Sequence, residues 1–170
     1  ARQAKILREE AEDNNLGVEA RDARWARWSA CSLCEQQYHG VVACALGWAC
    51  WRTYLGRPEG DWTRSMATSV LVSGLMKVRE TEAALVVQEA QLTTARRGAA
   101  SEAAILTIQS NLANTYDMLG RHSDALPILL HVYSGRLKIN GEEHRATLGA
   151  CTNVAVTLCT LRRFEEVKYY

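Results

Sequence analysis

Apolar and polar positions alternate with a helical period over most of this chain of 170 residues. From about Asp61 onward, apolar residues recur every three to four positions, as amphipathic helices require. Short polar breaks separate these stretches, so the pattern predicts helix, turn and helix in succession. The predicted stripes are Met66, Val70, Leu71 and Leu75; Ala84, Val87 and Leu92; Ile105, Ile108, Leu112, Tyr116 and Leu119; Ala125, Ile128, Leu129 and Val132; and Leu148, Cys151, Val154, Ala155, Leu158 and Leu161.

The helical stretches repeat. Leu71, Leu112 and Val154 recur at steps of 41 and 42 residues, and Ala84, Ala125 and Val167 recur with the same steps. One helix pair cannot bury both of its apolar faces, so such a repeat predicts stacked pairs. We expect an all-α fold, an α-solenoid of antiparallel helix pairs over residues 61–170, with repeats at about 61–99, 100–141 and 142–170. The last repeat is incomplete, so we expect further repeats or a partner to cover its apolar edge.

The first 60 residues differ from the repeats. Residues 1–30 form a charged helical lead-in, and Asn14–Gly17 is typical of a turn between two short helices. Ser29–Gly40 has no helical period and predicts a loop. Val41–Leu55 is apolar almost all round, which predicts a helix buried on two sides. We expect residues 31–60 to provide a Cys-containing helical cap for the array.

The lead-in contains the sequence RDARWARW, which interleaves arginine and tryptophan. Arg21, Arg24 and Arg27 recur every third residue beside Trp25 and Trp28. Such a pattern could stack nucleic-acid bases. Acidic neighbours balance the arginines, which favours an amphipathic helix that buries its tryptophans while the arginines cover the edge.

Composition narrows the choice of function. Apolar residues make up 48% of the chain, charged residues 23%, and the net charge is +1, so there is no general attraction to nucleic acid or membranes. The longest apolar run, Val41–Trp51, is too short to span a bilayer, and no secretory leader is visible. The six cysteines do not resemble a disulfide framework. We therefore expect free thiols in a reducing compartment, the cytoplasm or a plastid.

Four potential zinc ligands lie in and just after the predicted loop. Cys31, Cys34, His39 and Cys44 have the Cys-x2-Cys-x4-His-x4-Cys spacing of a zinc knuckle, a module that binds single-stranded nucleic acid. Against this interpretation, the glycines of a knuckle are missing, and Cys44 lies inside a predicted helix. A zinc-stabilised nucleic-acid binder is the alternative function, and zinc is the sole cofactor that the pattern suggests. A redox pair at Cys31 and Cys34 stays open, although the βαβ surroundings of thioredoxin-like proteins are lacking.

The middle repeat resembles a known family. Asn111-Leu112-Ala113, Tyr116, Gly120-Arg121, Asp124-Ala125, Pro127, and the linker Gly141–His144 before Thr147-Leu148 are similar to the long tetratricopeptide repeats of kinesin light chains, which are also common in families from unicellular algae. The resemblance covers about Asp61 to Tyr170. It departs from the family where Val72 replaces the expected alanine, and where Arg79 and Arg162 replace the turn glycine.

Physical reasons support the matched residues. Ala113 and Ala125 are small, so paired helices can approach closely, and Tyr116 fills the space between neighbouring repeats. Gly120 can adopt the left-handed conformation that ends a helix. Pro127 is tolerable only in the first turn of the second helix, where its missing N–H has no helical partner.

The resemblance implies a binding surface. In this architecture the first helix of each pair lines a concave groove, and asparagine amides suit the backbone of an extended peptide. The expected partner-binding residues are Lys77, Ser110, Asn111, Asn114, Asp117 and Asn153. We expect a scaffold that binds a partner protein or peptide through this groove or its open end, within a multi-subunit complex. No phosphate loop, nucleophile elbow, HExxH or dinucleotide fingerprint is present, so we do not expect an enzyme.

Overall fold

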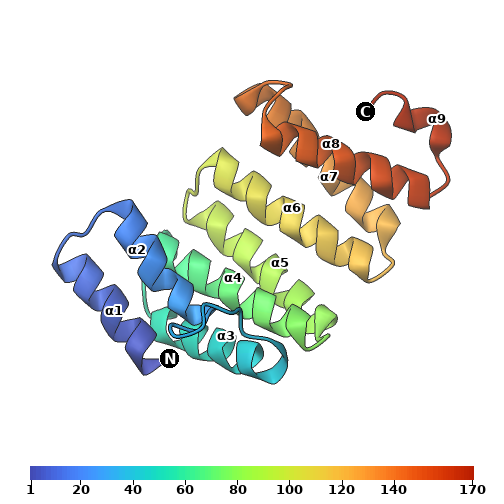
Figure 1. Ribbon diagram of the computed structural model, residues 1–170. Coiled ribbons are helices and arrows are strands. Elements are labelled where there is room, and N and C mark those ends of the chain that lie inside the picture. Colours follow the sequence, from blue (N-terminus) through green and yellow to red (C-terminus); the bar gives the residue numbers. More distant parts are fainter. The chain divides into compact units, whose positions relative to one another are not determined.

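Every regular element of the protein is a helix, in a computed structural model that describes residues 1–170 (Figure 1). The elements are α1 (Arg2–Asp13), α2 (Val18–Trp25), η1 (Ala26–Trp28), α3 (Gly40–Tyr54), α4 (Trp62–Lys77), α5 (Thr81–Arg97), α6 (Glu102–Met118), α7 (His122–Asn140), α8 (Arg145–Thr160) and α9 (Phe164–Val167). The one extended pairing is an isolated bridge between Ala30 and Gln37. The all-α prediction is confirmed. The helices form two compact units, Ala1–Val87 and Gln88–Tyr170, and the boundary falls within α5.

The turn that ends the first helix of each pair has the same conformation three times. Arg79, Gly120 and Arg162 have φ angles of 64°, 73° and 58°. The following N–H reaches back five residues in each case: Glu80 donates to Leu75 (3.0 Å), Arg121 to Tyr116 (2.9 Å) and Arg163 to Leu158 (2.9 Å). This is the Schellman arrangement, which satisfies the last carbonyls of a helix. The left-handed Gly120 is confirmed, and the two arginines adopt its conformation despite their side chains.

The repeat landmarks occupy the core. Leu71, Leu112 and Val154 are 1%, 4% and 0% exposed. Two details of the predicted stripes are wrong, because Met66 and Leu148 are exposed. Threonines are buried instead at five positions of the same helices: Thr63, Thr68, Thr115, Thr147 and Thr157. A hydropathy pattern scores threonine as polar and therefore misses them, although four of the five hydroxyls have partners inside the protein.

Close backbone contact joins α3 to α4 in the first compact unit. A Cβ atom added to Gly47 would lie 3.0 Å from the Leu71 Cα, and one added to Gly74 would lie 2.8 Å from the Ala43 carbonyl oxygen. Each helix thus presents a glycine where the other passes. Cys50 and Tyr54 continue the buried face of α3.

The opposite face of α3 is exposed, which corrects the expectation of a helix buried on two sides. Val41 is 78% exposed, Val42 55% and Trp48 41%. The high apolar content of the segment does not distinguish the two faces, and only the face that carries the small residues packs against α4.

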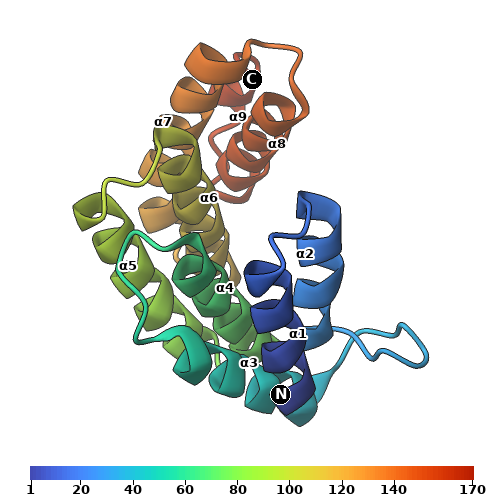
Figure 2. The ribbon, with the colours of Figure 1, turned by 90° about the vertical axis from the view of Figure 1, so that its left-hand side faces the viewer.

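The lead-in packs on this pair through an arginine. Arg8 is 1% exposed, and its guanidinium lies 4.7 Å from the centre of the Trp62 ring and 6.0 Å from that of Trp25. Its Nε donates to Glu12 (3.1 Å), and Glu12 also pairs with Arg57 (2.7 Å). The Arg8 guanidinium contacts two tryptophan rings, and Arg8 and Arg57 share the Glu12 carboxylate. These contacts fix α1 to the segments around it. Figure 2 shows α1 and α2 side by side.

The tryptophans of the RDARWARW sequence are buried. Trp25 is 7% exposed and Trp28 is 2% exposed, and both contact the Tyr54 ring. The interpretation as an amphipathic helix that buries its tryptophans is confirmed. These two rings are not available to stack nucleic-acid bases.

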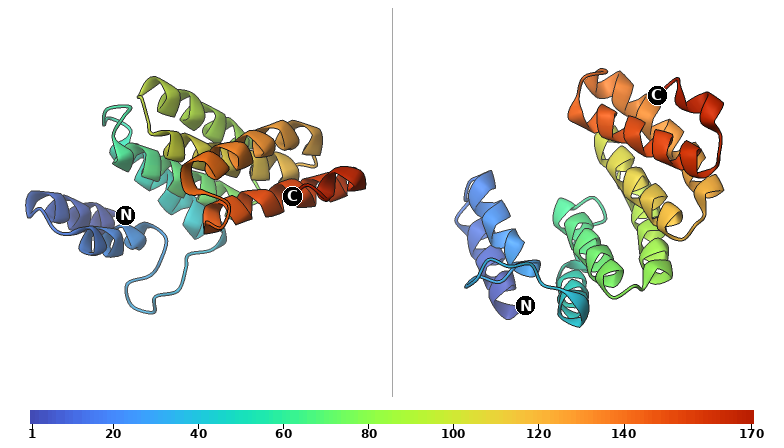
Figure 3. Two further views of the ribbon diagram at one scale, coloured as in Figure 1. Left: turned by 90° about the horizontal axis from the view of Figure 1, so that it is seen from above. Right: turned by 45° about the vertical axis from the view of Figure 1, so that its right-hand side comes forward.

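In the second compact unit, α6, α7 and α8 pack in succession, and α9 turns back after α8 (Figure 3). Ala113, Ala125, Leu129, Val154 and Leu158 belong to one buried cluster of this unit. The two alanines are fully buried, as expected of positions where helices approach closely.

Nowhere in the chain does a helix combine the length and the apolar character needed to cross a membrane. All six cysteines are free.

Candidate partner-binding surface

Polar and apolar side chains share one face of α6 and α8, the first helices of consecutive pairs. On α6, Asn111, Asn114 and Met118 follow one another at helical spacing, and all three are exposed. On α8, Thr152 and Val156 are exposed, and Asn153 between them is half-buried. We call these six residues the asparagine surface.

A hydrogen bond joins the two helices at the centre of the asparagine surface. The Asn153 Nδ2 donates to the Asn114 Oδ1 over 3.3 Å. An amide has two donor hydrogens and an acceptor oxygen. The Asn114 amino group and the Asn153 carbonyl oxygen therefore remain able to bind a ligand. These are the groups that the N–H and C=O of a peptide backbone require.

Asp117 lies one turn further along α6 and holds the helices together. One carboxylate oxygen accepts a hydrogen bond from the Thr157 hydroxyl (2.7 Å), and the other pairs with the His122 Nδ1 (2.9 Å). Thr157 is 1% exposed, so this bond satisfies a buried hydroxyl. Asp117 thus links α6 to α8 and to the first turn of α7, and both its oxygens have partners in the chain.

On another side of α6, Tyr116 links this helix to α5. Its hydroxyl donates to the Glu89 carboxylate over 2.7 Å, and this bond is the main reason that the pKa of Tyr116 is raised. The Arg121 guanidinium lies 4.6 Å from the ring centre. Ser110, at the other end of the expected site, is half-buried. These contacts fix the helix that carries Asn111 and Asn114.

Lys77 differs from the other expected binding residues. It ends α4 in the first compact unit, and its Nζ donates to the Tyr38 carbonyl oxygen over 2.8 Å. The ammonium group thus holds the end of the segment that precedes α3.

The four candidate zinc ligands are spread over different surroundings. Cys34 and His39 are exposed, Cys31 is half-buried, and Cys44 lies on α3 against the cluster around Leu71. No group of three or more His, Cys, Asp or Glu side chains is placed to hold a metal ion. Hydrogen bonds from the backbone of Cys34 and Leu33 and from the Cys34 side chain lower the pKa of Cys31. The structure therefore gives the knuckle interpretation no support.

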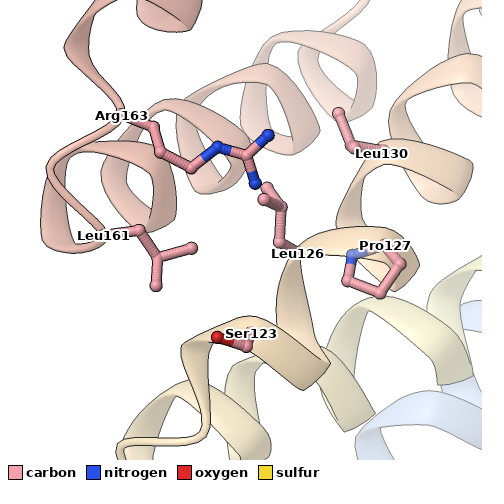
Figure 4. Close-up of a pocket in the computed structure, with 6 residues that line it drawn as sticks. All are labelled: Ser123, Leu126, Pro127, Leu130, Leu161 and Arg163. Carbon is pink, nitrogen blue, oxygen red and sulfur yellow. The ribbon is translucent and has the colours of Figure 1, made fainter.

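A cavity of about 320 Å³ opens beside α7 in the second compact unit (Figure 4). Its lining residues are Ser123, Leu126, Pro127, Leu130, Leu161 and Arg163. The Arg163 guanidinium makes two hydrogen bonds to Glu166, at 2.6 and 2.8 Å. Because its one charged group is neutralised in this way, the cavity lacks the converging polar groups of a specific small-molecule site.

The position of Pro127 corrects a prediction. α7 begins at His122, so Pro127 lies in its second turn and inside the helix. The sequence pattern placed the start of this helix near Ala125, which would have put the proline in the first turn. The missing N–H deprives the Ser123 carbonyl of its helical partner.

Three residues of this region escape sequence reasoning: Glu89, His122 and Thr157. Each makes a hydrogen bond to the tyrosine or aspartate of α6 that sequence analysis did identify. The spacing of Asp117 and His122 across a short turn is the sole local signal. The bonds of Glu89 and Thr157 depend on how separate helices pack.

Comparison with known proteins supports the repeat interpretation. Residues 105–146 match the model of the tetratricopeptide repeat family. One similar solved structure is that of a Podospora anserina protein described as nearly identical TPR-like repeats of a kinesin light chain, with one substitution. It aligns with a TM-score of 0.58 and 17% sequence identity. The alignment covers 99% of this chain and 89% of that chain. No curated protein sequence matches the chain. The predicted resemblance and the TPR-like fold class are confirmed.

Proposed function

We propose that this chain, an array of helix pairs with a tetratricopeptide repeat at its centre, is a non-catalytic scaffold that binds a partner protein. Tetratricopeptide repeats are in general scaffolds for interactions between proteins. One observation supports the proposal most strongly: the paired amides of Asn114 and Asn153 stand on the first helices of consecutive pairs.

The ligand that suits this surface is an extended peptide segment of the partner. Peptide N–H and C=O groups alternate along a strand, and the asparagine surface offers an amide donor and an amide acceptor next to each other. Met118 and Val156, which are 66% and 59% exposed, flank these amides and can contact apolar side chains of the peptide. A backbone-reading surface of this kind tolerates several peptide sequences.

The expected binding residues divide into two roles. Asn111, Asn114, Asn153 and Ser110 present groups that a peptide can contact. Asp117 and Lys77 position helices and loops, since their charged groups bond to Thr157, His122 and Tyr38. We expect the scaffold to work as a subunit of a larger complex, in a reducing compartment such as the cytoplasm or a plastid.

The test compares partner recovery between variants. Quantitative affinity purification with the wild-type chain identifies partners, and the Asn111→Ala/Asn153→Ala double variant should recover them at least about tenfold less, a loss of roughly 1.4 kcal/mol of binding. Ser134→Ala, an exposed change on α7, is the matched control. Undiminished recovery by a correctly folded double variant would remove the asparagine surface from the proposal.

A further inference from the structure

A tight turn brings Cys31 and Cys34 together in the segment before α3. The Cys31 carbonyl oxygen accepts a hydrogen bond from the Glu35 N–H (3.0 Å), and the Cys31 N–H donates to the Gln36 carbonyl oxygen (2.9 Å). The bridge between Ala30 and Gln37 closes the base of this loop. Figure 2 shows the segment extending from the helices of its unit. Its backbone is thus defined by hydrogen bonds although its tip projects outward.

The spacing within this turn suits a disulfide. Residues three apart in a helix-like turn have Cβ atoms about 5–6 Å from each other. This separation needs only a small adjustment to reach the distance that a disulfide requires. Interactions with the Cys34 backbone and side chain lower the pKa of the Cys31 thiol, which agrees with this proximity.

The surroundings of the Cys31 sulphur favour its reaction. The Leu33 N–H donates to the Cys31 Sγ over 3.5 Å. Cys31 is only half-buried, and Cys34 is exposed, so a small disulfide can reach both residues. Backbone donors around a sulphur stabilise the thiolate, which is the nucleophile in thiol chemistry. Arg27 adds a positive charge nearby.

The other four cysteines lack this arrangement. Cys50 is 0% exposed, and burial raises the pKa of its thiol to about 12. The Cys151 thiol donates to the Tyr170 carbonyl oxygen over 2.8 Å. Cys44 packs against the core of the first unit, and Cys159 is exposed on α8. Two free thiols that lie in one turn and are not buried point to exchange chemistry.

We propose that Cys31 and Cys34 form a reversible redox pair that exchanges with low-molecular-weight disulfides such as oxidised glutathione. The Cys31 thiolate attacks the disulfide, forms a mixed disulfide with one half and releases the other half as a thiolate. The Cys34 thiol then loses its proton to solvent, attacks the Cys31 sulphur and displaces the second half, which takes up a proton. The protein loses two electrons and two protons, and the small disulfide gains them as two thiols.

The reaction stays local. The loop is bounded by the Ala30–Gln37 bridge on one side and by the bond from Lys77 to the Tyr38 carbonyl on the other. Oxidation therefore changes the tip of the loop and leaves the helices in place. Exposed disulfides of this kind are easily reduced, as a regulatory pair must be.

Exchange with oxidised glutathione tests the proposal on the full chain. After incubation, free thiols are alkylated, and peptide mass mapping locates the oxidised cysteines. The wild type should contain a Cys31–Cys34 disulfide, and Cys34→Ser should accumulate a mixed disulfide between glutathione and Cys31. Cys159→Ser should react as the wild type does. At neutral pH, Cys31 should be alkylated at least about threefold faster than Cys159.

Three results would overturn the redox pair. The first is a wild-type chain in which Cys159 is oxidised while Cys31 and Cys34 stay reduced. The second is a Cys34→Ser variant, folded by circular dichroism, that carries no glutathione on Cys31. The third is one equivalent of zinc in the purified wild type that is lost in Cys34→Ser, which would assign the loop to metal binding. None of these results depends on whether the asparagine surface binds a peptide.

Discussion

Arg79 and Arg162 occupy a backbone conformation that suits glycine better. A residue with a Cβ in the left-handed region is disfavoured by roughly 1–2 kcal/mol, whereas glycine adopts it freely. Both arginines are exposed, and their turns keep the hydrogen bonds that Gly120 makes possible in the middle pair. The repeated fold thus imposes the conformation of the turn on two residues that do not favour it.

Substituting these arginines should stabilise the protein. Arg79→Gly and Arg162→Gly each remove the strain but add flexibility to the unfolded chain, so we expect a net gain of about 0.5–1 kcal/mol. Gly120→Ala introduces the strain and should cost about 1 kcal/mol. Urea denaturation followed by circular dichroism measures all three. A loss of stability in Arg162→Gly as large as that in Gly120→Ala would contradict this account of the turn.

Substitutions of Asp117 and of Asn114 should lower the stability of the protein by different amounts, although both residues were expected to bind a partner. Asp117→Ala leaves the buried Thr157 hydroxyl without its acceptor and should lower the free energy of unfolding by about 1–3 kcal/mol. Asn114→Ala removes one exposed amide pair and should cost less than about 0.5 kcal/mol. Thermal unfolding of the two variants distinguishes the roles. Equal losses would show that Asp117 is no more structural than Asn114.

The residues of the site could be predicted only in part. Helical period places Asn111 and Asn114 on one face of α6, and the repeat places Asn153 at the corresponding level of α8. The partners of Asp117 and Lys77 could not be predicted. A period defines which face a side chain occupies, but the atom that bonds to it depends on how neighbouring elements pack.

At the scale of elements, α3 and α4 depend on two glycines that hydropathy does not reveal. Gly47 and Gly74 let the backbones approach until a Cβ would contact the other helix at 3.0 and 2.8 Å. The neighbouring atoms are backbone atoms, which cannot move as a flexible side chain can. The two helices can therefore relieve the steric clash of an added methyl group only by moving apart.

A matched pair of substitutions tests this close packing. Gly74→Ala should destabilise the first compact unit by about 1–3 kcal/mol, because the added methyl group forces the helices apart. Gly149→Ala changes a glycine in α8 that has open space around it, and it should stabilise that helix by about 0.5–1 kcal/mol. Hydrogen exchange at the α3 and α4 amides locates the effect. Unaltered protection of α3 and α4 in Gly74→Ala would contradict the close approach.

The positions of the helices along the chain were largely predictable, whereas the face that each helix buries was less so. The segment Val41–Leu55 was expected to be helical, and α3 spans Gly40–Tyr54. Its exposed face was not expected, because an evenly apolar sequence carries no signal of which side packs. The start of α7 was missed for a related reason: His122 and Ser123 are polar, so the apolar stripe begins after the helix itself.

At the scale of the whole molecule, the repeat was the most informative feature of the sequence. Stacked helix pairs must bury equivalent positions, which is why Leu71, Leu112 and Val154 all reach the core. The division into two compact units within α5 could not be predicted, since the helical pattern runs through the boundary. The central claim concerns the second of these units, where α6 and α8 form the asparagine surface.

Site-specific photocrosslinking tests that claim most directly. A photoreactive amino acid is placed at Asn111 or Val156 on the asparagine surface, and at Ser134 on α7 as the control. The account predicts that a partner recovered with the wild-type chain is crosslinked from the first two positions and much less from Ser134. Crosslinking from Ser134 alone, with none from Asn111 and Val156, would contradict the claim that the partner binds across α6 and α8.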